Sequence, residues 1–311
     1  MTSDSWTTLD MPDQFGRTVV ITGANSGLGL ASAEALARSG AQVVMACRSP
    51  ERGSVALERV KGIATGPEPQ LLRLDLADPS SIEDAAATLA DSVAHVDVLM
   101  NNAGVMAPPF MTTADGHEMQ FGTNHLGHFA FTGLVLPLLR AAPAARVVTT
   151  SSTMHRAGKM HWDDLDWSNG YRKWPAYGQS KLANLLFGFE LDRRARAAGL
   201  PLLSMVAHPG YASTHLQVAG PELSGRQLSA RLMGLANALF AQSAEDGALP
   251  QLFAATSEQA VGGCYYGPGG IAEMHGSPKI VQPTSAALRV EDWARLWQVS
   301  EDLTGVSYDL G

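Results

Sequence analysis

The segment that decides the fold is Thr22-Gly23-Ala24-Asn25-Ser26-Gly27-Leu28-Gly29, which ends an apolar run and leads directly into a helical pattern. Glycines are needed in such a turn where the backbone takes left-handed angles or approaches a phosphate group closely. The spacing G-x-x-x-G-x-G differs by one residue from the common dinucleotide-binding pattern G-x-G-x-x-G. A strand, a glycine-rich turn and a helix in this order predict a pyrophosphate site. The alternative is a glycine-rich turn that holds no ligand.

The rest of the chain repeats this alternation of short apolar runs and longer helical patterns. The runs expected to be strands are Thr18–Thr22, Gln42–Cys47, Gln70–Asp75, Val96–Met100, Ala145–Ser151, Leu202–Ala207 and Gly262–Tyr266. Helices are expected near Gly27–Ser39, Glu51–Lys61, Ser80–Ser92, Gly116–Leu139 and Pro175–Ala198. Continuous apolar runs are typical of parallel strands that are covered on both faces. The sequence therefore predicts an α/β fold of Rossmann type, a doubly wound seven-stranded parallel sheet with helices on both faces.

Composition limits the classes of function. The 311 residues carry 22 Lys and Arg against 30 Asp and Glu, and the net charge of −8 disfavours nucleic acid and anionic lipid as partners. The two cysteines, Cys47 and Cys264, cannot form a disulfide framework and fit a reducing compartment. The sequence shows neither a signal peptide nor a membrane span. We expect a cytoplasmic protein, with a homo-oligomer possible.

The predicted organisation is a polar leader over residues 1–14 and a single nucleotide-binding domain over residues 15–311. Two segments, 155–174 and 211–241, interrupt the alternation of strands and helices. Both follow the ends of predicted strands, where ligands bind in open α/β sheets. We therefore expect these segments to cover the substrate. Their many Trp, Met and Leu residues favour an apolar ligand.

The end of the second predicted strand bears on the choice of cofactor. Dinucleotide sites that select NAD place an acidic residue about 20 residues after the glycine turn, where it holds the ribose 2′-hydroxyl. This chain has Cys47-Arg48-Ser49 there instead. A guanidinium with no competing carboxylate suits a 2′-phosphate. Arg48 therefore predicts that NADP(H) is preferred over NAD(H), and a surface arginine with no ligand is the alternative.

A pair of residues in the last long helical pattern indicates acid/base chemistry. Tyr177 and Lys181 are four residues apart, so a helix places both on one face. A free tyrosine has a pKa of about 10 and is a poor acid or base at neutral pH. A neighbouring ammonium favours the phenolate and is expected to lower the tyrosine pKa. Alone the pair is a weak signal, and it gains weight from the motifs around it.

Those motifs are Asn101-Asn102-Ala103-Gly104, Gly122-Thr123-Asn124-His125-Leu126-Gly127, Thr149-Thr150-Ser151-Ser152 and His208-Pro209-Gly210. With the glycine turn and the Tyr177/Lys181 pair, they follow the order and approximate spacing of the short-chain dehydrogenase/reductase family. The resemblance covers about residues 15–270. Within this family, the motif sequences are most similar to those of the branch that contains retinol dehydrogenases and the WW-domain oxidoreductase.

The resemblance implies roles for the matching residues. Tyr177 looks like the catalytic acid/base and Lys181 its partner, which also binds the nicotinamide ribose. Ser152 matches the serine that bonds the substrate oxygen, with Ser151 left open as the alternative. Asn124 matches the asparagine that orders a proton-relaying water. The implied cofactor contacts are Gly23, Asn25, Ser26, Gly27, Leu28, Gly29, Arg48, Asp75, Leu76, Asn102, Ala103, Gly104, Tyr177, Lys181, Pro209, Gly210 and Thr214.

Two hypotheses of different classes follow. The first is an NADP-dependent oxidoreductase that interconverts a carbonyl and an alcohol on an apolar small molecule. The second is a catalytically silent nucleotide-binding regulatory protein of the same fold, although such proteins usually lose the tyrosine or the lysine. No metal site is expected, because His117, His125 and His128 lack the spacing of the zinc-protease motif.

Overall fold

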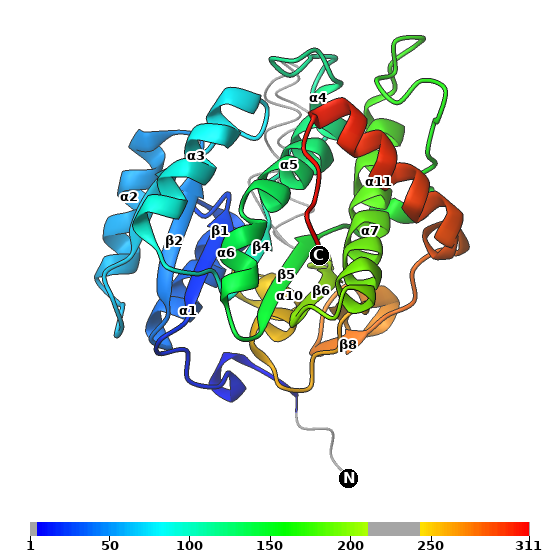
Figure 1. Cartoon of the computed structure of the whole chain (residues 1–311). Helices are drawn as coiled ribbons and strands as arrows, with labels where there is room; N and C mark the ends of the chain where they lie inside the picture. The colour runs from blue at the N-terminus through cyan, green and yellow to red at the C-terminus, as the bar shows by residue number, and fades with distance from the viewer. Residues whose placement is uncertain (1–4, 211–242, 311) are drawn as a thin grey trace, which may run out of the picture.

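The computed structural model describes residues 5–210 and 243–310, which form one sheet between two layers of helices (Figure 1). Its strand order is β3-β2-β1-β4-β5-β6-β7-β8. The strands are β1 Thr18–Thr22, β2 Gln42–Cys47, β3 Gln70–Arg73, β4 Val98–Asn101, β5 Ala145–Thr150, β6 Leu202–Ala207, β7 Tyr265–Pro268 and β8 Pro278–Ile280. The predicted doubly wound α/β fold is confirmed.

The strand count differs from the prediction, since the sheet has eight strands and not seven. Strands β1 to β7 are parallel, and β8 pairs with β7 in the antiparallel direction. Strand β8 has three residues, begins with a proline and leaves Lys279 and Ile280 exposed. An edge strand this short carries no apolar run in the sequence, so the hydrophobic pattern could not reveal it.

The helices cover the sheet in two layers, each with its own hydrophobic core. Their bounds are α1 Gly27–Arg38, α2 Pro50–Lys61, α3 Pro79–Ser92, α4 Met119–Phe121, α5 Gly127–Leu134, α6 Leu136–Ala141, α7 Lys173–Ala197, α10 Ala244–Thr256 and α11 Val290–Thr304, with short 3-10 helices at Thr8–Asp10, Thr153–Ala157, Ile271–Glu273 and Ser285–Leu288. One core joins the sheet to α1, α2 and α10, and the other joins it to α3, α5, α6 and α7. Figure 1 shows α11 lying across α7 at the outside of the second layer.

The prediction of one long helix over Gly116–Leu139 is wrong. The segment forms α4, a π-helical turn at Gly122–Leu126, α5 and α6. Val135, with φ −90° and ψ 2°, separates α5 from α6, and Pro137 cannot donate to the helix ladder. A π-helical turn inside a helix is frequently found at functional sites. This one contains Asn124.

The described residues before β1 pack on the domain. Trp6 makes an edge contact with Phe253 of α10 at 5.3 Å between ring centroids, and the Gln14 side chain is buried. No helix within residues 5–210 and 243–310 is long and apolar enough to cross a membrane.

The strand order reverses between β1 and β4, and the two carboxyl ends diverge there. In open α/β sheets this is the place where ligands bind. The glycine turn follows β1, Asn102 follows β4, Ser151 and Ser152 follow β5, and His208 follows β6. The fold therefore gathers the sequence motifs along one edge of the sheet.

Candidate active site

The glycine turn after β1 has the backbone that a phosphate cradle needs. Gly23 has φ +68° and Gly27 has φ +53°, in the left-handed region that favours glycine. A Cβ at Gly29 would lie 2.4 Å from the Gly23 carbonyl oxygen and 2.6 Å from Asn102 Nδ2, so only glycine fits. These three glycines hold the turn tightly against β4.

The N-terminus of α1 differs from those of its neighbours. Ser49, Asp78 and Ser243 cap α2, α3 and α10 with side-chain hydrogen bonds, whereas Ser26 makes no such bond to α1. The first N–H groups of a helix have no intrahelical acceptor and attract anions. The turn therefore fits a pyrophosphate, with the α1 N–H groups as its donors.

A buried polar network ties this turn to β4. Thr22 Oγ1 accepts from the backbone N–H groups of Asn102 and Ala103, each at 2.9 Å. Asn102 Nδ2 donates to the Thr22 carbonyl at 2.8 Å. Asn102 and Ala103, two of the residues expected to contact the cofactor, thus stand beside the glycine turn. Gln251 of α10 joins them through Asn102 Oδ1 at 3.3 Å and Ser32 Oγ at 2.7 Å, a contribution that no sequence motif signalled.

At the end of β2 the last strand residue, Cys47, is buried, and the next residue, Arg48, is exposed. The Cys47 side chain is buried, and its burial raises the pKa of the thiol to about 11, so it carries no charge at neutral pH. Arg48 follows as an exposed residue, and Ser49 begins the cap of α2 by accepting from Arg52 N at 3.2 Å. The tip of β2 therefore offers a cation to solvent and presents no acidic side chain at position 47.

Asp75 and Leu76 lie just after β3. Asp75 Oδ1 accepts from Ala77 N at 3.0 Å, and Asp75 N donates to Ser81 Oγ at 2.9 Å. Leu76 is buried, and a Cβ at Gly127 would lie 2.3 Å from its carbonyl oxygen. Both residues stand at the same sheet edge as the glycine turn, where the adenine contact is expected.

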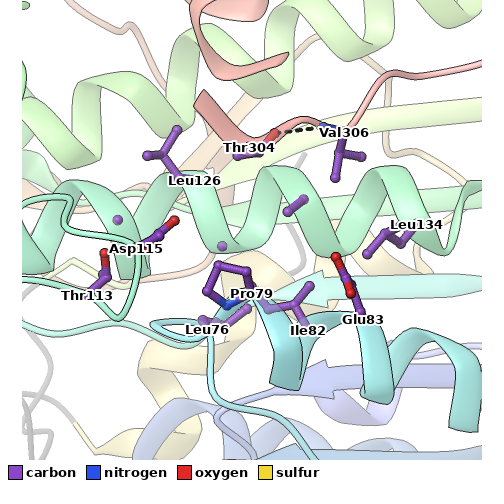
Figure 2. Close-up of a pocket in the computed structure, with 13 residues that line it drawn as sticks. Leu76, Pro79, Ile82, Glu83, Thr113, Asp115, Leu126, Leu134, Thr304 and Val306 are labelled. Carbon is purple, nitrogen blue, oxygen red and sulfur yellow. Dashed lines mark hydrogen bonds between the residues drawn. The ribbon is translucent and has the colours of Figure 1, made fainter. Parts of the chain in front are cut away.

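Leu76 also borders a separate pocket between α3, α5 and the C-terminal segment (Figure 2). Thr304 and Val306 close one side of it through a hydrogen bond of 3.2 Å. Its lining includes Pro79, Ile82, Glu83, Leu126, Ala130 and Leu134. The pocket is lined by neither Tyr177 nor Lys181, so it is distinct from the candidate active site.

Tyr177 and Lys181 share one buried face of α7. The Lys181 ammonium lies 5.8 Å from the centre of the Tyr177 ring and donates to the Thr150 carbonyl at 3.1 Å. The Lys181 side chain is buried, and burial lowers the pKa of its ammonium to about 8. An ammonium has three donors, so beyond the bond to the Thr150 carbonyl Lys181 can donate to a further polar group, as the ribose of a dinucleotide would provide.

The pKa of Tyr177 differs from the sequence expectation. Burial raises it to about 12, partly offset by a hydrogen bond with Ser152, so the phenol is protonated at neutral pH. Desolvation by burial is the largest cause of the raised pKa. A protonated tyrosine beside a serine can donate a proton to a carbonyl oxygen.

The two serines after β5 have different surroundings. Ser151 is buried, and its Oγ donates to the Lys181 carbonyl at 2.7 Å. Ser152 is partly buried, accepts from Met154 N at 3.2 Å and reaches the Tyr177 hydroxyl. This geometry supports Ser152 over Ser151 as the serine that faces the reacting oxygen.

Asn124 sits in the π-helical turn with its side chain fully engaged. Its Oδ1 accepts from Val105 N at 2.7 Å, and its Nδ2 donates to Val105 O at 3.0 Å and to Ser180 Oγ at 2.9 Å. Gly104 packs closely here, since a Cβ would lie 3.0 Å from Asn124 Oδ1 and 3.6 Å from Lys181 Nζ. Asn124, Gly104 and Lys181 therefore meet, as the resemblance implies.

His128 adds a link that the sequence did not reveal. Its Nδ1 lies 3.0 Å from the Asn124 carbonyl and its Nε2 lies 2.8 Å from Thr22 Oγ1. Burial lowers its pKa to about 4, so the ring is neutral. The imidazole thus connects the glycine turn to the π-helical turn, and its spacing in the sequence prompted only a metal hypothesis. No group of three metal-ligating side chains occurs within the described ranges.

The segment 155–174 is fixed by hydrogen bonds to the start of α4 and to α7, the helix that carries Tyr177. Asp166 accepts from Glu118 N at 2.9 Å, and Gln179 donates to Leu165 O at 2.8 Å. Trp174 belongs to the first turn of α7 itself, and its ring lies 6.5 Å from the Tyr177 ring. The other predicted covering segment, 211–241, and Thr214 lie outside the described residues, while Pro209 and Gly210 follow β6 at the same sheet edge.

Comparison with known proteins decides the family. Residues 17–222 match the family model for short chain dehydrogenases. The chain belongs to the short-chain dehydrogenase family. The family binds NAD(P), and this short-chain dehydrogenase is an oxidoreductase that acts on CH–OH groups.

Individual relatives agree with this assignment. Human retinol dehydrogenase 13 is 38% identical over 294 residues, which cover 94% of this chain and 85% of that protein. Human retinol dehydrogenase 11 is 38% identical over 296 residues, covering 94% and 87%. A solved structure of an uncharacterized protein from Mycobacterium paratuberculosis has a TM-score of 0.79 and 41% identity, covering 98% of this chain and 99% of that one. A short chain dehydrogenase from Shigella flexneri complexed with NADP shares the fold, with a TM-score of 0.62 and 20% identity over 82% and 98% of the two chains.

Proposed function

We propose that this short-chain dehydrogenase uses NADP(H) to interconvert a carbonyl and an alcohol on an apolar small molecule. The observation that carries the proposal is the buried Tyr177, which touches Ser152 and shares one face of α7 with Lys181. The pair stands at the sheet edge that also holds the uncapped N-terminus of α1.

The residues divide the chemistry between them. When bound, the dinucleotide supplies the hydride. Ser152 holds the substrate oxygen by a hydrogen bond, and Tyr177 donates its phenolic proton to that oxygen as it becomes an alcohol; general acid catalysis contributes about 10²- to 10⁴-fold. Lys181 stabilises the phenolate that remains. The resemblance implies that Asn124 orders a water that relays a proton towards Lys181; because both Nδ2 protons are used by Val105 and Ser180, only its oxygens would hold that water. In the reverse direction Tyr177 accepts the proton.

Arg48 supports the choice of NADP(H). It is exposed directly after β2, and the side chain before it is a neutral, buried thiol instead of a carboxylate. A guanidinium pairs with phosphate oxygens through two parallel hydrogen bonds, which contribute about 1.5–3 kcal/mol when charged. The NADP named in the Shigella flexneri structure is consistent with this proposal.

An apolar substrate is supported by exposed aromatic side chains at segment 155–174 and by the relatives. Trp174 is 41% exposed with its ring 6.5 Å from the Tyr177 ring, and Phe110 is 52% exposed and packs on Tyr171 at 5.3 Å between ring centroids. The curated relatives are named retinol dehydrogenases, so a retinoid-, steroid- or lipid-like carbonyl is the first class to test. The cytoplasmic location, the absence of nucleic-acid partners and any homo-oligomer stay predictions.

The test is NADPH oxidation followed by absorbance with retinal, ketosteroids, quinones, short aldehydes and keto acids. Tyr177→Phe is expected to lose at least 100-fold in kcat, as general acid catalysis implies, while it retains NADPH binding. Tyr308→Phe is the matched control, because that hydroxyl bonds the Phe129 carbonyl at 2.6 Å beside the C-terminus. Wild-type protein that binds NADPH but reduces none of these carbonyls would instead favour the silent regulatory protein.

Cofactor choice has its own test. Arg48→Ala is expected to weaken NADPH binding about 10- to 100-fold and leave NADH unchanged, because only NADPH carries the 2′-phosphate. Arg140→Ala is the control, since that side chain pairs with Asp309 at the C-terminus. Equal affinity of the wild-type protein for NADPH and NADH contradicts the assignment of Arg48.

A further inference from the structure

Three charged or polar side chains meet beyond the carboxyl ends of neighbouring strands. His208 follows β6, Glu273 lies in the turn between β7 and β8, and Arg156 lies in the 3-10 helix that follows Ser152. His208 Nε2 lies 3.1 Å from Glu273 Oε2, and Arg156 Nη2 lies 2.8 Å from Glu273 Oε1. The Glu273 carboxylate therefore connects the segments after β5, β6 and β7, and we call these three residues the carboxylate lock.

The orientation of the His208 ring is determined by its neighbours. Its Nδ1 accepts from Gly210 N at 3.1 Å, which leaves the ring proton on Nε2, facing Glu273. The side chain has 0% exposure, and the 3.1 Å approach of Nε2 to Glu273 Oε2 lacks the alignment of a full hydrogen bond. Neither atom has a hydrogen-bond partner elsewhere in the described part of the chain, and because a buried polar atom without a partner is costly, this close contact favours keeping the ring beside the carboxylate.

The same ring and turn enclose Gly210. Gly210 has φ +68°, and a Cβ there would lie 2.5 Å from the Met274 carbonyl oxygen and 2.8 Å from that of Glu273. On the other side of the ring, a Cβ at Gly267 would lie 2.0 Å from His208 Nε2. The start of the segment that follows β6 is therefore packed tightly between the His208 ring and the turn that carries Glu273.

The turn between β7 and β8 has an unusual backbone conformation at Ala272 and Glu273. Ala272 and Glu273 have φ +52° and +57°, left-handed values that residues with a Cβ rarely adopt. Such conformations persist where the surrounding contacts determine them, and they concentrate at functional sites. Here the unusual backbone brings the Glu273 carboxylate to Arg156 and His208.

The strand order shows which part of a dinucleotide the carboxylate lock faces. Arg48 follows β2 on one side of the β1/β4 switch point, whereas β6 and β7 lie on the other side, beyond β5. The His208 ring packs on Tyr265 at 5.1 Å between centroids, and the Tyr265 hydroxyl lies 3.4 Å from Nδ1 of His155, in the 3-10 helix that follows Ser152. The lock is therefore on the Tyr177 side of the site, away from the end where Arg48 would bind the 2′-phosphate.

We propose that Glu273, held by Arg156, fixes the His208 ring and thereby positions the Pro209–Gly210 backbone for the nicotinamide half of the cofactor. His208 and Glu273 are then positioning residues for that half and have no role at the adenosine half. This inference rests on the proposed function, since it requires that a dinucleotide binds.

The experiment compares two ligands by calorimetry. NADPH contains both halves of the dinucleotide, whereas adenosine 2′,5′-bisphosphate contains only the half expected at Arg48. His208→Asn keeps an acceptor for Gly210 N but cannot reach Glu273, and Glu273→Gln removes the charge with little change in size. Glu291→Gln, an exposed position in the first turn of α11, is the matched control.

Each single variant is expected to bind NADPH about tenfold more weakly and adenosine 2′,5′-bisphosphate within twofold of wild type. The double variant is expected to be no weaker than either single variant, because both remove one interaction. Unchanged NADPH affinity, or equal weakening of both ligands, overturns the inference. If wild type binds neither ligand, the proposed function itself fails. Should His208→Asn not fold, Glu273→Gln decides, because its side chain is 23% exposed and tolerates the change.

Discussion

Alanine substitutions at the two adjacent serines after β5 are expected to have similar effects on stability and very different effects on the reaction rate. Ser151→Ala removes a buried hydrogen bond of 2.7 Å to the Lys181 carbonyl. That carbonyl lies inside α7 and keeps its intrahelical bond, so no acceptor is left unsatisfied and the loss of unfolding free energy is about 1 kcal/mol. For a chain of this size the loss lowers Tm by about 2 °C. The serine faces away from the reacting oxygen, so kcat is expected to stay within about threefold of wild type.

Ser152→Ala removes a different set of contacts. The hydroxyl accepts from Met154 N at 3.2 Å as the cap of a 3-10 helix, and loss of such a cap also costs about 1 kcal/mol. The same hydroxyl reaches Tyr177 and is expected to bond the substrate oxygen. Removing one donor to a developing oxyanion lowers kcat by about 10²- to 10³-fold. The two variants should therefore have similar Tm values and very different rates.

The assay pairs thermal unfolding with initial rates of NADPH oxidation, using the best carbonyl substrate from the panel. The KM for NADPH serves as the internal control and is expected to stay unchanged in both variants. If Ser151→Ala lost 100-fold in kcat while Ser152→Ala remained active, the assignment drawn from the two hydrogen-bond patterns would be refuted.

Two further predictions concern the cofactor turn and the buried histidines. Gly29→Ala is expected to lower the unfolding free energy by about 1–3 kcal/mol and NADPH affinity at least tenfold, because its Cβ would lie 2.4 Å from the Gly23 carbonyl oxygen. Gly62→Ala is the control in thermal unfolding and calorimetry, since a Cβ there meets nothing nearer than 3.6 Å; equal effects of the two changes contradict the close-contact argument. Burial lowers the pKa of His125 from 6.5 to about 3, so the unfolded chain binds a proton that the folded protein does not, and stability falls as pH drops below 6.5. Between pH 6.5 and about pH 5 the loss is about 2 kcal/mol, and His125→Gln should reduce the acid-induced fall in Tm; an identical fall in both proteins means that His125 does not bind the extra proton on unfolding.

The sequence by itself determined the features that depend on neighbours along the chain. A glycine turn between a β-branched run and a helix is a local arrangement, since left-handed angles and an uncapped helix start need only a few consecutive residues. The pairing of Tyr177 with Lys181 follows from helical spacing alone. Largely apolar runs likewise predicted β1 to β7, because parallel strands covered on both faces bury most of their side chains.

The tertiary structure decided what depends on partners far apart in the chain. Ser151 and Ser152 cannot be told apart until α7 packs on β5 and takes the first serine as a donor. Strand β8 forms by antiparallel hydrogen bonding to β7 at the edge of the sheet, and this pairing is not encoded by a local apolar pattern.

The pKa of Tyr177 also depends on tertiary structure and not on local sequence alone. Spacing predicted the ammonium nearby, but burial, which no local pattern reports, raises the pKa to about 12. The meeting of His208, Glu273 and Arg156 joins segments that follow three different strands. Local sequence encodes backbone conformation and helical faces, whereas desolvation and contacts between strand ends arise only when the sheet assembles.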